Sequence, residues 1–400
     1  MTDSLPATPE GGADDARRIR LMLLGSGEFG RELAIAFQRF GAEVIAVERY
    51  ADAPAHGVAD QSVVVELTDA DELAAVIGRL QPNFVVTVTD EVAVDALTTA
   101  EPGFAQVFPT ARSARLTADR EGLRRLAADE LGLPTAPFWF AGSLDELRAV
   151  AEHAGYPLRV RPVAPTAGPG QSVISGPHDV EPAWRRAMAG RVLAESIVEF
   201  DVRVTLLAVR SDGPGGPVIE LCAPIGHGEA SGDVLESWQP QQISVTALDS
   251  AKSIAARIVN ALGGRGVFGV ELLIHGDEVY FCDVSVRPYE CALATLRTQR
   301  LSVFELQARA ILGLATDTIM ISPGAAQLLY PGNEAVDAGP GQAALADALA
   351  VPESDVRVFG HGRPDGRWPL AAAVVTAADA SVARERVGQV AAALRKRRQS

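Results

Sequence analysis

The chain has 400 residues, of which 48% are hydrophobic and 22% charged, and its formal net charge is −15. This length supports two or three domains with their own cores. The negative charge argues against nucleic acid or an anionic membrane as a partner, because both bind through basic patches. No apolar run approaches the length of a membrane span, and the first residues lack a signal-peptide segment. Cys222, Cys282 and Cys291 lack metal-type spacing, which predicts reduced thiols in a cytoplasmic protein.

The first part of the chain alternates between apolar runs and helical patterns. Residues 1–18, rich in Ala, Gly, Pro and Asp, predict a disordered tail. Strands are predicted at 19–24, 44–47, 63–65 and 84–88, with helices from the glycine-rich turn at 25–30 through 40 and at 69–80. This alternation predicts a doubly wound parallel sheet.

The glycine-rich turn at 25–30 also admits a dinucleotide-binding interpretation. Glu48 would be the ribose-binding acid that such sites place about 20 residues after the glycines. The chain soon departs from a six-stranded Rossmann unit, however, so we disfavour NAD(P) binding.

From about residue 120 the pattern changes to mixed helices and strands. Helices are predicted at 118–131, 248–262 and 304–312. A further helix is predicted to begin after Ser143, which would cap it together with Glu146 three residues later. Strands are predicted near 138 and at 158–163, 191–198, 202–209 and 218–223, with a flexible loop at 165–172. Short strands after residue 315 and a final helix from about 382 predict a small C-terminal domain.

The most informative segment is 269–288, which predicts two strands joined by a His-Gly-Asp turn. Pairing across that turn would bring Glu271 and Asp283 together on one face of a hairpin. Two adjacent carboxylates raise each other's pKa unless a cation lies between them. Mg²⁺, held by one or two carboxylates and by phosphate oxygens, is the usual cation. The alternative from these residues alone is a solvated hairpin edge with scattered acids.

The order G-V-E, turn, acid and V-S-V-R-P resembles the metal-binding core of the ATP-grasp ligases. The strings GSGEFGRE (25–32), ERYADAPA (48–55), REGLRRLA (120–127) and ESWQPQQ (236–242) are similar to one family within that group. This is the formate-dependent phosphoribosylglycinamide formyltransferase family of purine biosynthesis. The resemblance runs from about residue 19 to about 378 in one register.

The resemblance implies an α/β and α+β fold with three parts. These are a doubly wound N-terminal substrate domain at 19–119, a two-lobed ATP-grasp domain at 120–315 and a small β-rich C-terminal domain at 316–400. It implies an enzyme that uses ATP and Mg²⁺ to transfer the formyl group of formate to phosphoribosylglycinamide. It also implies a homodimer.

The family's functional positions can be carried over residue by residue. Glu271 and Asp283 occupy the metal positions, and Asp283 replaces a glutamate. The nucleotide positions are Arg120, Arg161, Glu195, Ser196, Ile197 and Val198, where Arg161 replaces a phosphate-binding lysine. The substrate positions are Glu28, Phe29, Glu290, His361 and Arg367, and Arg287 is a candidate catalytic residue.

Several positions depart from the family pattern. Pro169 replaces a lysine of the phosphate-covering loop, and Arg203 replaces a ribose-binding acid. Val88 replaces a glutamate of the substrate site, with Asp90 and Glu91 close by. In the last domain, His361, Trp368 and Pro369 occupy positions where the family has basic residues. Arg363 and Arg367 lie close by in the sequence and are candidate replacements.

These departures leave three hypotheses open. The chain is a working formyltransferase with altered contacts, an ATP-grasp enzyme with a changed acceptor, or a non-catalytic descendant that binds a metabolite or a partner. Retention of Glu271, Asp283 and Arg120 favours the first, and Pro169 and Arg203 motivate the last.

Overall fold

The computed structural model describes residues 18–100, 105–163, 170–187, 190–230, 234–330, 340–359 and 368–395. Residues 1–17 of the predicted tail, most of the 165–172 loop with Pro169, and positions 361, 363 and 367 lie outside this set. Within the described ranges, no helix combines the length and the apolar character that a membrane crossing needs.

The first sheet has five parallel strands in the order β3-β2-β1-β4-β5. They are β1 (Arg20–Leu24), β2 (Glu43–Glu48), β3 (Gln61–Val64), β4 (Phe84–Thr87) and β5 (Gln106–Phe108). Four consecutive residues of β1, Leu21 to Leu24, are fully buried, as expected when helices cover both faces of a parallel sheet. The helices of this region are α1 (Glu28–Gln38), α2 (Ala70–Leu80), α3 (Val94–Ala100) and α4 (Ala111–Ala118), with a 3₁₀ turn, η1, at Pro54–Gly57. The predicted doubly wound parallel sheet is confirmed.

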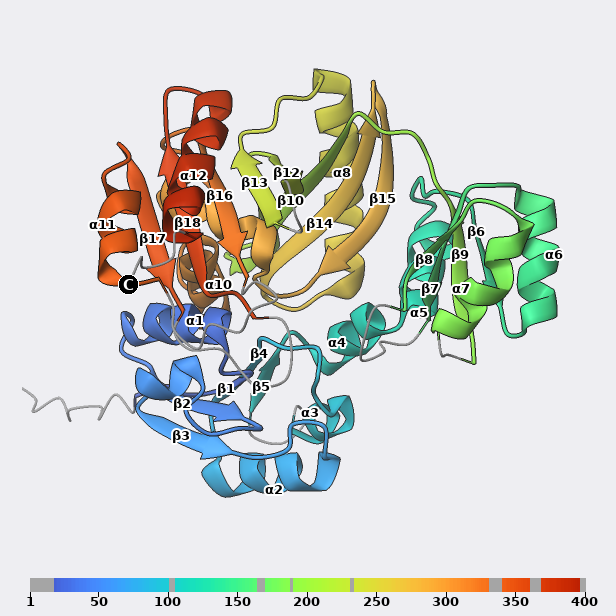
Figure 1. The fold of residues 1–400 in the computed structure, drawn as a ribbon. Coiled ribbons are helices and arrows are strands. Elements are labelled where there is room, and N and C mark those ends of the chain that lie inside the picture. Colours follow the sequence, from blue (N-terminus) through green and yellow to red (C-terminus); the bar gives the residue numbers. More distant parts are fainter. Residues whose placement is uncertain are drawn as a thin grey trace, which may run out of the picture.

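A separate four-stranded antiparallel sheet, β6-β9-β7-β8, forms a small lobe on the right of Figure 1. Its elements are β6 (Phe138–Ala141), α6 (Leu144–Ala154), β7 (Leu158–Pro162), β8 (Ser172–Ile174), η3 (Pro177–Asp179), α7 (Val180–Ala187) and β9 (Val192–Ser196). Ser143 caps α6 as predicted, because its hydroxyl accepts the Glu146 amide at 3.1 Å. Along β7, Leu158 and Val160 are buried in the lobe while Arg161 lies on the opposite face.

The helix predicted at 118–131 is interrupted. Asp119 has an extended backbone and caps a new helix by accepting the Glu121 amide. The observed elements are α5 (Arg120–Arg125) and a π-helical turn, η2, at Leu126–Glu130. The sequence prediction missed the boundary because Asp is both a tolerated helix residue and a favoured N-cap.

The largest sheet has nine strands, in the order β15-β14-β10-β12-β13-β16-β18-β17, with β11 paired to β10. They are β10 (Val202–Gly213), β11 (Gly216–Leu221), β12 (Ile225–Ala230), β13 (Val234–Gln239), β14 (Gly266–His275), β15 (Glu278–Ser285), β16 (Gly324–Leu329), β17 (Ser354–Val358) and β18 (Ala371–Thr376). Three of them come from beyond residue 315, so one sheet crosses the predicted boundary at 315/316. The division into three domains stays a prediction.

Helices complete this layer. They are α8 (Val245–Leu262), η4 (Glu290–Ala294), α9 (Thr295–Thr298), α10 (Val303–Leu312), α11 (Gln342–Leu349) and α12 (Ala380–Arg395). Helix α8 packs against β10, β14 and β15 in one apolar core, and α12 packs on β16 and β18. The acidic hairpin β14–β15 is therefore backed by the apolar face of α8 (Figure 1).

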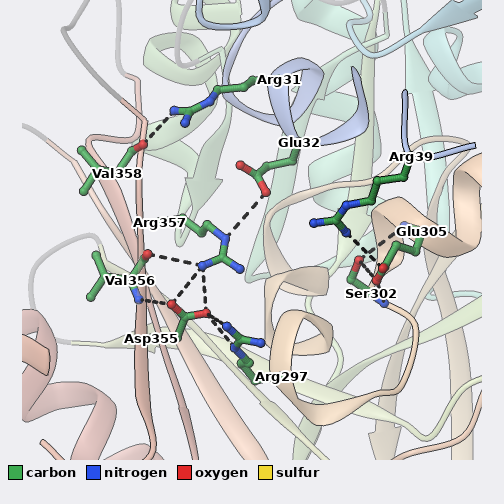
Figure 2. A network of polar contacts seen from close by, with 10 residues as sticks. All are labelled: Arg31, Glu32, Arg39, Arg297, Ser302, Glu305, Asp355, Val356, Arg357 and Val358. Atoms are coloured by element: carbon green, nitrogen blue, oxygen red, sulfur yellow. Dashed lines mark hydrogen bonds and ion pairs between the residues drawn. The ribbon is translucent and has the colours of Figure 1, made fainter. Parts of the chain in front are cut away.

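Helix α1 joins the first sheet to the C-terminal strands through the polar contacts in Figure 2. Arg31 donates to the Val358 carbonyl at 3.0 Å. Arg357 on β17 lies 3.7 Å from Glu32 and 2.8 Å from Asp355, and Asp355 also pairs with Arg297. These contacts fix α1, whose first turn borders a pocket described below.

Candidate active site

The centre of the candidate site is the antiparallel pair β14–β15. Glu271 and Asp283 are direct cross-strand partners, as predicted. The register shifts beside Glu271, and the extra residue on β15 is Cys282. Gly276 makes the tight turn at a φ of 55°. Cross-strand partners share a face of the sheet, so both carboxylates point to the same side.

Cations surround this pair of acids. The Arg203 Nε atom lies 3.6 Å from Glu271 Oε1, from the neighbouring strand β10. Burial raises the pKa of Asp283; the positive charge of Arg161 opposes this shift and the charge of Glu271 adds to it. Burial also raises the pKa of the adjacent Cys282 thiol, which is therefore neutral. The two carboxylates therefore favour a bound cation, and Arg203 already pairs with one of them, Glu271.

A buried ion network ties the small lobe to the hairpin. Glu195 on β9 is 5% exposed and accepts from Arg124 at 2.5 Å and Arg161 at 2.6 Å. Arg124, on α5, also donates to the carbonyls of Cys282 at 3.0 Å and Phe281 at 3.3 Å. Each Glu195 oxygen thus has an arginine partner. The role of Arg124 was not predicted from the sequence, although it lies one helical turn after Arg120.

Arg120, on α5, and Arg161, on β7, lie near one another, and the charge of Asp283 acts on both. The charged region that these two arginines share with Glu271 and Asp283 is called the cleft. Arg120 donates to the Pro162 carbonyl at 2.8 Å. Burial, and next the charge of Arg161, lower the pKa of Arg120, while Asp283 and Glu195 oppose that shift. An arginine keeps its charge even so. Two guanidinium groups therefore face the region of the acid pair.

A pocket lies where the end of β9 meets the hairpin. Its lining combines apolar walls with a polar edge: Arg124, Ala136, Arg159, Glu195, Ser196, Ile197, Val198, Phe200, Leu273, Tyr280, Phe281 and Cys282. Two backbone donors at this edge are already used, because the Ser196 amide donates to Pro137 and the Ile197 amide to Pro157. The four residues predicted from 195 to 198 all line this pocket.

A second pocket lies at the carboxyl ends of the first sheet. It is lined by Gly25, Gly27, Glu28, Phe29, Gly30, Glu48, Arg49, Glu66, Leu67, Val88, Thr89 and Glu91. Glu48 is 6% exposed and accepts the amides of Ser26 and Arg49, both at 3.0 Å. Its carboxylate therefore holds the glycine turn, which gives it a structural role in place of ribose binding. Glu28, Phe29 and Val88 all border this pocket.

The remaining predicted residues are dispersed. Arg287 forms a two-contact ion pair with Asp90, described further below. Glu290 accepts the Tyr330 hydroxyl at 2.5 Å. The indole nitrogen of Trp368 is buried without a hydrogen-bond partner in the described part of the chain. His361 and Arg367 lie outside the described residues.

A buried polar cluster beside Glu271 was not predicted from the sequence. Tyr289 donates to the Thr205 hydroxyl at 2.6 Å, and Thr205 lies 3.1 Å from His227 Nε2. Burial lowers the pKa of His227 and raises that of Tyr289, so both groups are neutral. Thr205 is the cross-strand partner of Glu271. No local motif marks this cluster, because it forms only when β10, β12 and the segment after β15 pack together.

The two carboxylates of Glu271 and Asp283 suit Mg²⁺ only if a bound nucleotide supplies further oxygen ligands. Among the described residues, no three His, Cys, Asp or Glu side chains converge as a metal site. Mg²⁺ commonly takes one or two carboxylates and completes its shell with water and nucleotide phosphates. Glu271 and Asp283 supply that number of carboxylates, so they fit a nucleotide-bound Mg²⁺, with Arg203 as a competing charge on Glu271.

Comparisons with known proteins cover nearly the whole chain. A family model described as a ribonucleotide synthetase pre-ATP-grasp domain matches residues 19–117, and an ATP-grasp domain model matches residues 126–304. A formate-dependent phosphoribosylglycinamide formyltransferase of Corynebacterium glutamicum is 49% identical over 385 residues, covering 94% of each chain. One from Burkholderia pseudomallei is 48% identical and covers 94% of this chain and 95% of its own.

Solved structures give the same picture. A glycinamide-RNase-transformylase T from Mycobacterium tuberculosis is 60% identical with a TM-score of 0.82, covering 94% of this chain and 99% of its own. An N5-carboxyaminoimidazole ribonucleotide synthetase from Thermotoga maritima has a TM-score of 0.80 at 20% identity, covering 92% of this chain and 97% of its own. The second likeness concerns the fold alone.

Proposed function

The chain belongs to the formate-dependent phosphoribosylglycinamide formyltransferase family of ATP-grasp enzymes, and we propose that it formylates phosphoribosylglycinamide with formate and ATP in purine biosynthesis. The observation that carries this proposal is the pairing of Glu271 with Asp283 in a cleft that also receives Arg120 and Arg161. Relatives that share this function match the chain over 94% of its length, which favours this function over a changed acceptor or a non-catalytic role.

The chemistry explains why the site needs cations. Formate is a poor acyl donor, because direct attack by an amine would have to expel oxide. In the proposed reaction, a formate oxygen attacks the γ-phosphorus of ATP, the bond to ADP breaks, and formyl phosphate forms. The glycinamide amine then attacks the formyl carbon, phosphate leaves, and the amine proton passes to solvent. Fixed positive charge lowers the barrier of the first step because negative charge moves among the phosphoryl oxygens.

Glu271 and Asp283 would hold Mg²⁺ on the nucleotide phosphates. The ion would supply charge neutralisation for the transferring phosphoryl group. The role of the protein is to fix the two oxygen ligands on a rigid hairpin backed by α8, so that they need no rearrangement when nucleotide binds.

We place ATP between the small lobe and the hairpin. The pocket at residues 195–198, with its apolar walls, suits adenine. The amides of Ser196 and Ile197 already donate within the protein, so other backbone groups of this segment would form the polar edge. Arg161 and Arg120 would face the phosphates. Because Arg124 and Arg161 already engage Glu195, we assign Glu195 to positioning these arginines rather than to direct adenine contact.

We place the acceptor at the pocket of the first sheet. Besides Glu48, which holds the glycine turn, its lining contains three glutamates and one arginine, which suits a ligand carrying an amine and hydroxyl groups. Glu28 and Phe29 lie at the start of α1 and border this pocket, and Glu290 is held by Tyr330. The roles of His361 and Arg367 stay predictions from the resemblance, as does the homodimer, which sedimentation would test.

Two measurements test the proposal. Calorimetry should detect binding of Mg²⁺-ATP, and ADP release should require formate and phosphoribosylglycinamide together. Omitting either substrate is the matched control for slow ATP hydrolysis. Binding of Mg²⁺-ATP without any formate-dependent turnover would favour a changed acceptor, and absence of binding would favour a non-catalytic descendant.

A further inference from the structure

One ion pair joins the mouth of the first domain to the end of the acidic hairpin. Asp90 lies in the loop after β4, beside the pocket residues Thr89 and Glu91. Arg287 lies just after β15, four positions beyond Asp283. Arg287 Nε donates to Asp90 Oδ1 at 3.1 Å, and its Nη2 contacts Oδ2. The carboxylate is thus held by two parallel contacts from one guanidinium.

The two partners differ in exposure. The side chain of Arg287 is 23% exposed, whereas that of Asp90 is 59% exposed. The Arg287 backbone is anchored, because the Ser285 hydroxyl donates to its carbonyl at 3.0 Å. Solvent-exposed ion pairs contribute little to stability. The guanidinium is therefore the fixed partner, and a competing anion can displace the carboxylate.

The surroundings of Asp90 also favour an anion. Its charge acts on Arg120, the first residue of α5, which is also in the field of Asp283. The carboxylate therefore lies in the field of two arginines contributed by different parts of the ATP-grasp region. In a chain with a net charge of −15, such a position is a local exception. Arg287, the partner of Asp90, follows Asp283, one of the two acids of the proposed phosphoryl-transfer site, by four residues along the chain.

We propose that Arg287 binds the carboxylate of formate, and that Asp90 occupies this position until formate displaces it. A guanidinium fork matches a planar group with two oxygens, which is the shape shared by formate and the head of an aspartate. The inference rests on the proposed function, because it names where that reaction takes its one-carbon substrate. Its consequence is that the affinity for formate is set by competition with an internal carboxylate.

The experiment measures formate in two ways: the KM for formate in turnover, and equilibrium binding of ¹³C-formate by NMR with Mg²⁺ and a non-hydrolysable ATP analogue. Asp90→Asn and Asp90→Ala remove the competing carboxylate, so the affinity for formate should rise about 2- to 5-fold. This is the largest change that the loss of an exposed ion pair supports. Arg287→Lys keeps the charge but loses the fork, and should weaken formate at least 10-fold. The affinity for ATP should not change in any of these variants.

Asp95→Asn is the matched control, because Asp95 forms an exposed pair with Arg115 at 2.9 Å in the same domain. It should leave formate binding unchanged. The proposal is overturned if Asp90→Ala weakens formate binding, or if Arg287→Lys weakens ATP binding and spares formate, which would assign Arg287 to the phosphates. Formate binding through Arg287 without turnover would refute the proposed function and leave this inference standing.

Discussion

The cleft beside the acidic hairpin and the pocket of the first sheet are opposite in charge. The cleft gathers five arginines: Arg120, Arg124, Arg161, Arg203 and Arg287. The pocket gathers four glutamates and a single arginine: Glu28, Glu48, Glu66, Glu91 and Arg49. The negative net charge of the chain matches the charge of the pocket but not that of the cleft. Arg120 and Arg161, which have no acidic ligand of Mg²⁺ as a direct ion-pair partner, allow an acidic protein to take a polyanionic nucleotide, whereas Arg203 neutralises Glu271.

The two regions also differ in how firmly they are built. In the cleft, Glu195 is buried between Arg124 and Arg161 before any ligand arrives. At the pocket mouth, the Arg49–Glu91 pair is 38% and 68% exposed at 3.3 Å. The cleft is preorganised for charge, while the pocket mouth has an ion pair exposed to water; only Glu48, which holds the glycine turn, is a buried acid of this pocket. Mutations in the two regions should therefore have different consequences.

The largest expected effect is on stability, in the cleft. Glu195→Gln would leave Arg124 and Arg161 buried without a counter-charge, which typically costs about 3–5 kcal/mol. Denaturant unfolding measures this loss. Glu91→Gln is the control from the pocket and should cost less than about 1 kcal/mol. Equal losses in both variants would remove the distinction between a preorganised cleft and an open pocket.

The next effect is on nucleotide binding. Glu271→Gln should weaken Mg²⁺-ATP by about 5- to 150-fold, which corresponds to about 1–3 kcal/mol. Stability without nucleotide should be unchanged or slightly raised, because a pair of like charges is relieved. Calorimetry and thermal melting measure the two quantities. Glu385→Gln, an exposed acid on α12 that lines neither pocket, is the control. A loss of stability with unchanged ATP affinity would make Glu271 structural.

A smaller effect is expected at Arg203, the cleft residue whose charge opposes metal binding. Removing it in Arg203→Met should tighten Mg²⁺-ATP about 10-fold, and Arg203→Glu should tighten it further, because the cation lies 3.6 Å from Glu271. Mn²⁺ binding followed by EPR gives a readout without turnover. If the wild type binds Mg²⁺-ATP at micromolar levels and neither variant improves it, Arg203 is an adaptation that aids binding.

The smallest effect concerns the pH dependence of stability and comes from a histidine near the pocket residue Glu48, whose charge acts on it. His56, in the 3₁₀ turn next to the glycine turn, has its pKa lowered by burial, against the charges of Glu48 and Asp52. Between the folded and unfolded pKa values, the unfolded chain binds more protons, so stability falls as pH drops below about 6.5. His56→Gln should flatten this part of the stability curve. Parallel curves for the two proteins would show that His56 does not contribute.

Local patterns predicted much of this architecture. The parallel sheet follows from apolar runs spaced by helices, and the Glu271–Asp283 pairing follows from a hairpin whose partners are close in sequence. Such features need no long-range information. The same holds for the Ser143 cap, which depends on two residues three positions apart.

Contacts between distant segments could not be predicted in this way. Strand β13 pairs with β16, so Glu236 faces Gln327, and this pairing joins the C-terminal strands to the large sheet. The partner of Glu195 was missed because Arg124 reaches it from another element. The sequence places Asp90 two residues after Val88, but its pairing with Arg287 depends on how two parts of the chain pack.

In the proposed reaction, the arginine-lined cleft activates formate by transferring the γ-phosphoryl group of ATP to it. Turnover with ¹⁸O-labelled formate reports on this step, because a formate oxygen becomes part of the phosphate that leaves. We predict one ¹⁸O atom in each inorganic phosphate released, detected by mass spectrometry, and formylated acceptor in equal amount. Phosphate that carries no ¹⁸O while formylated product accumulates would contradict the account.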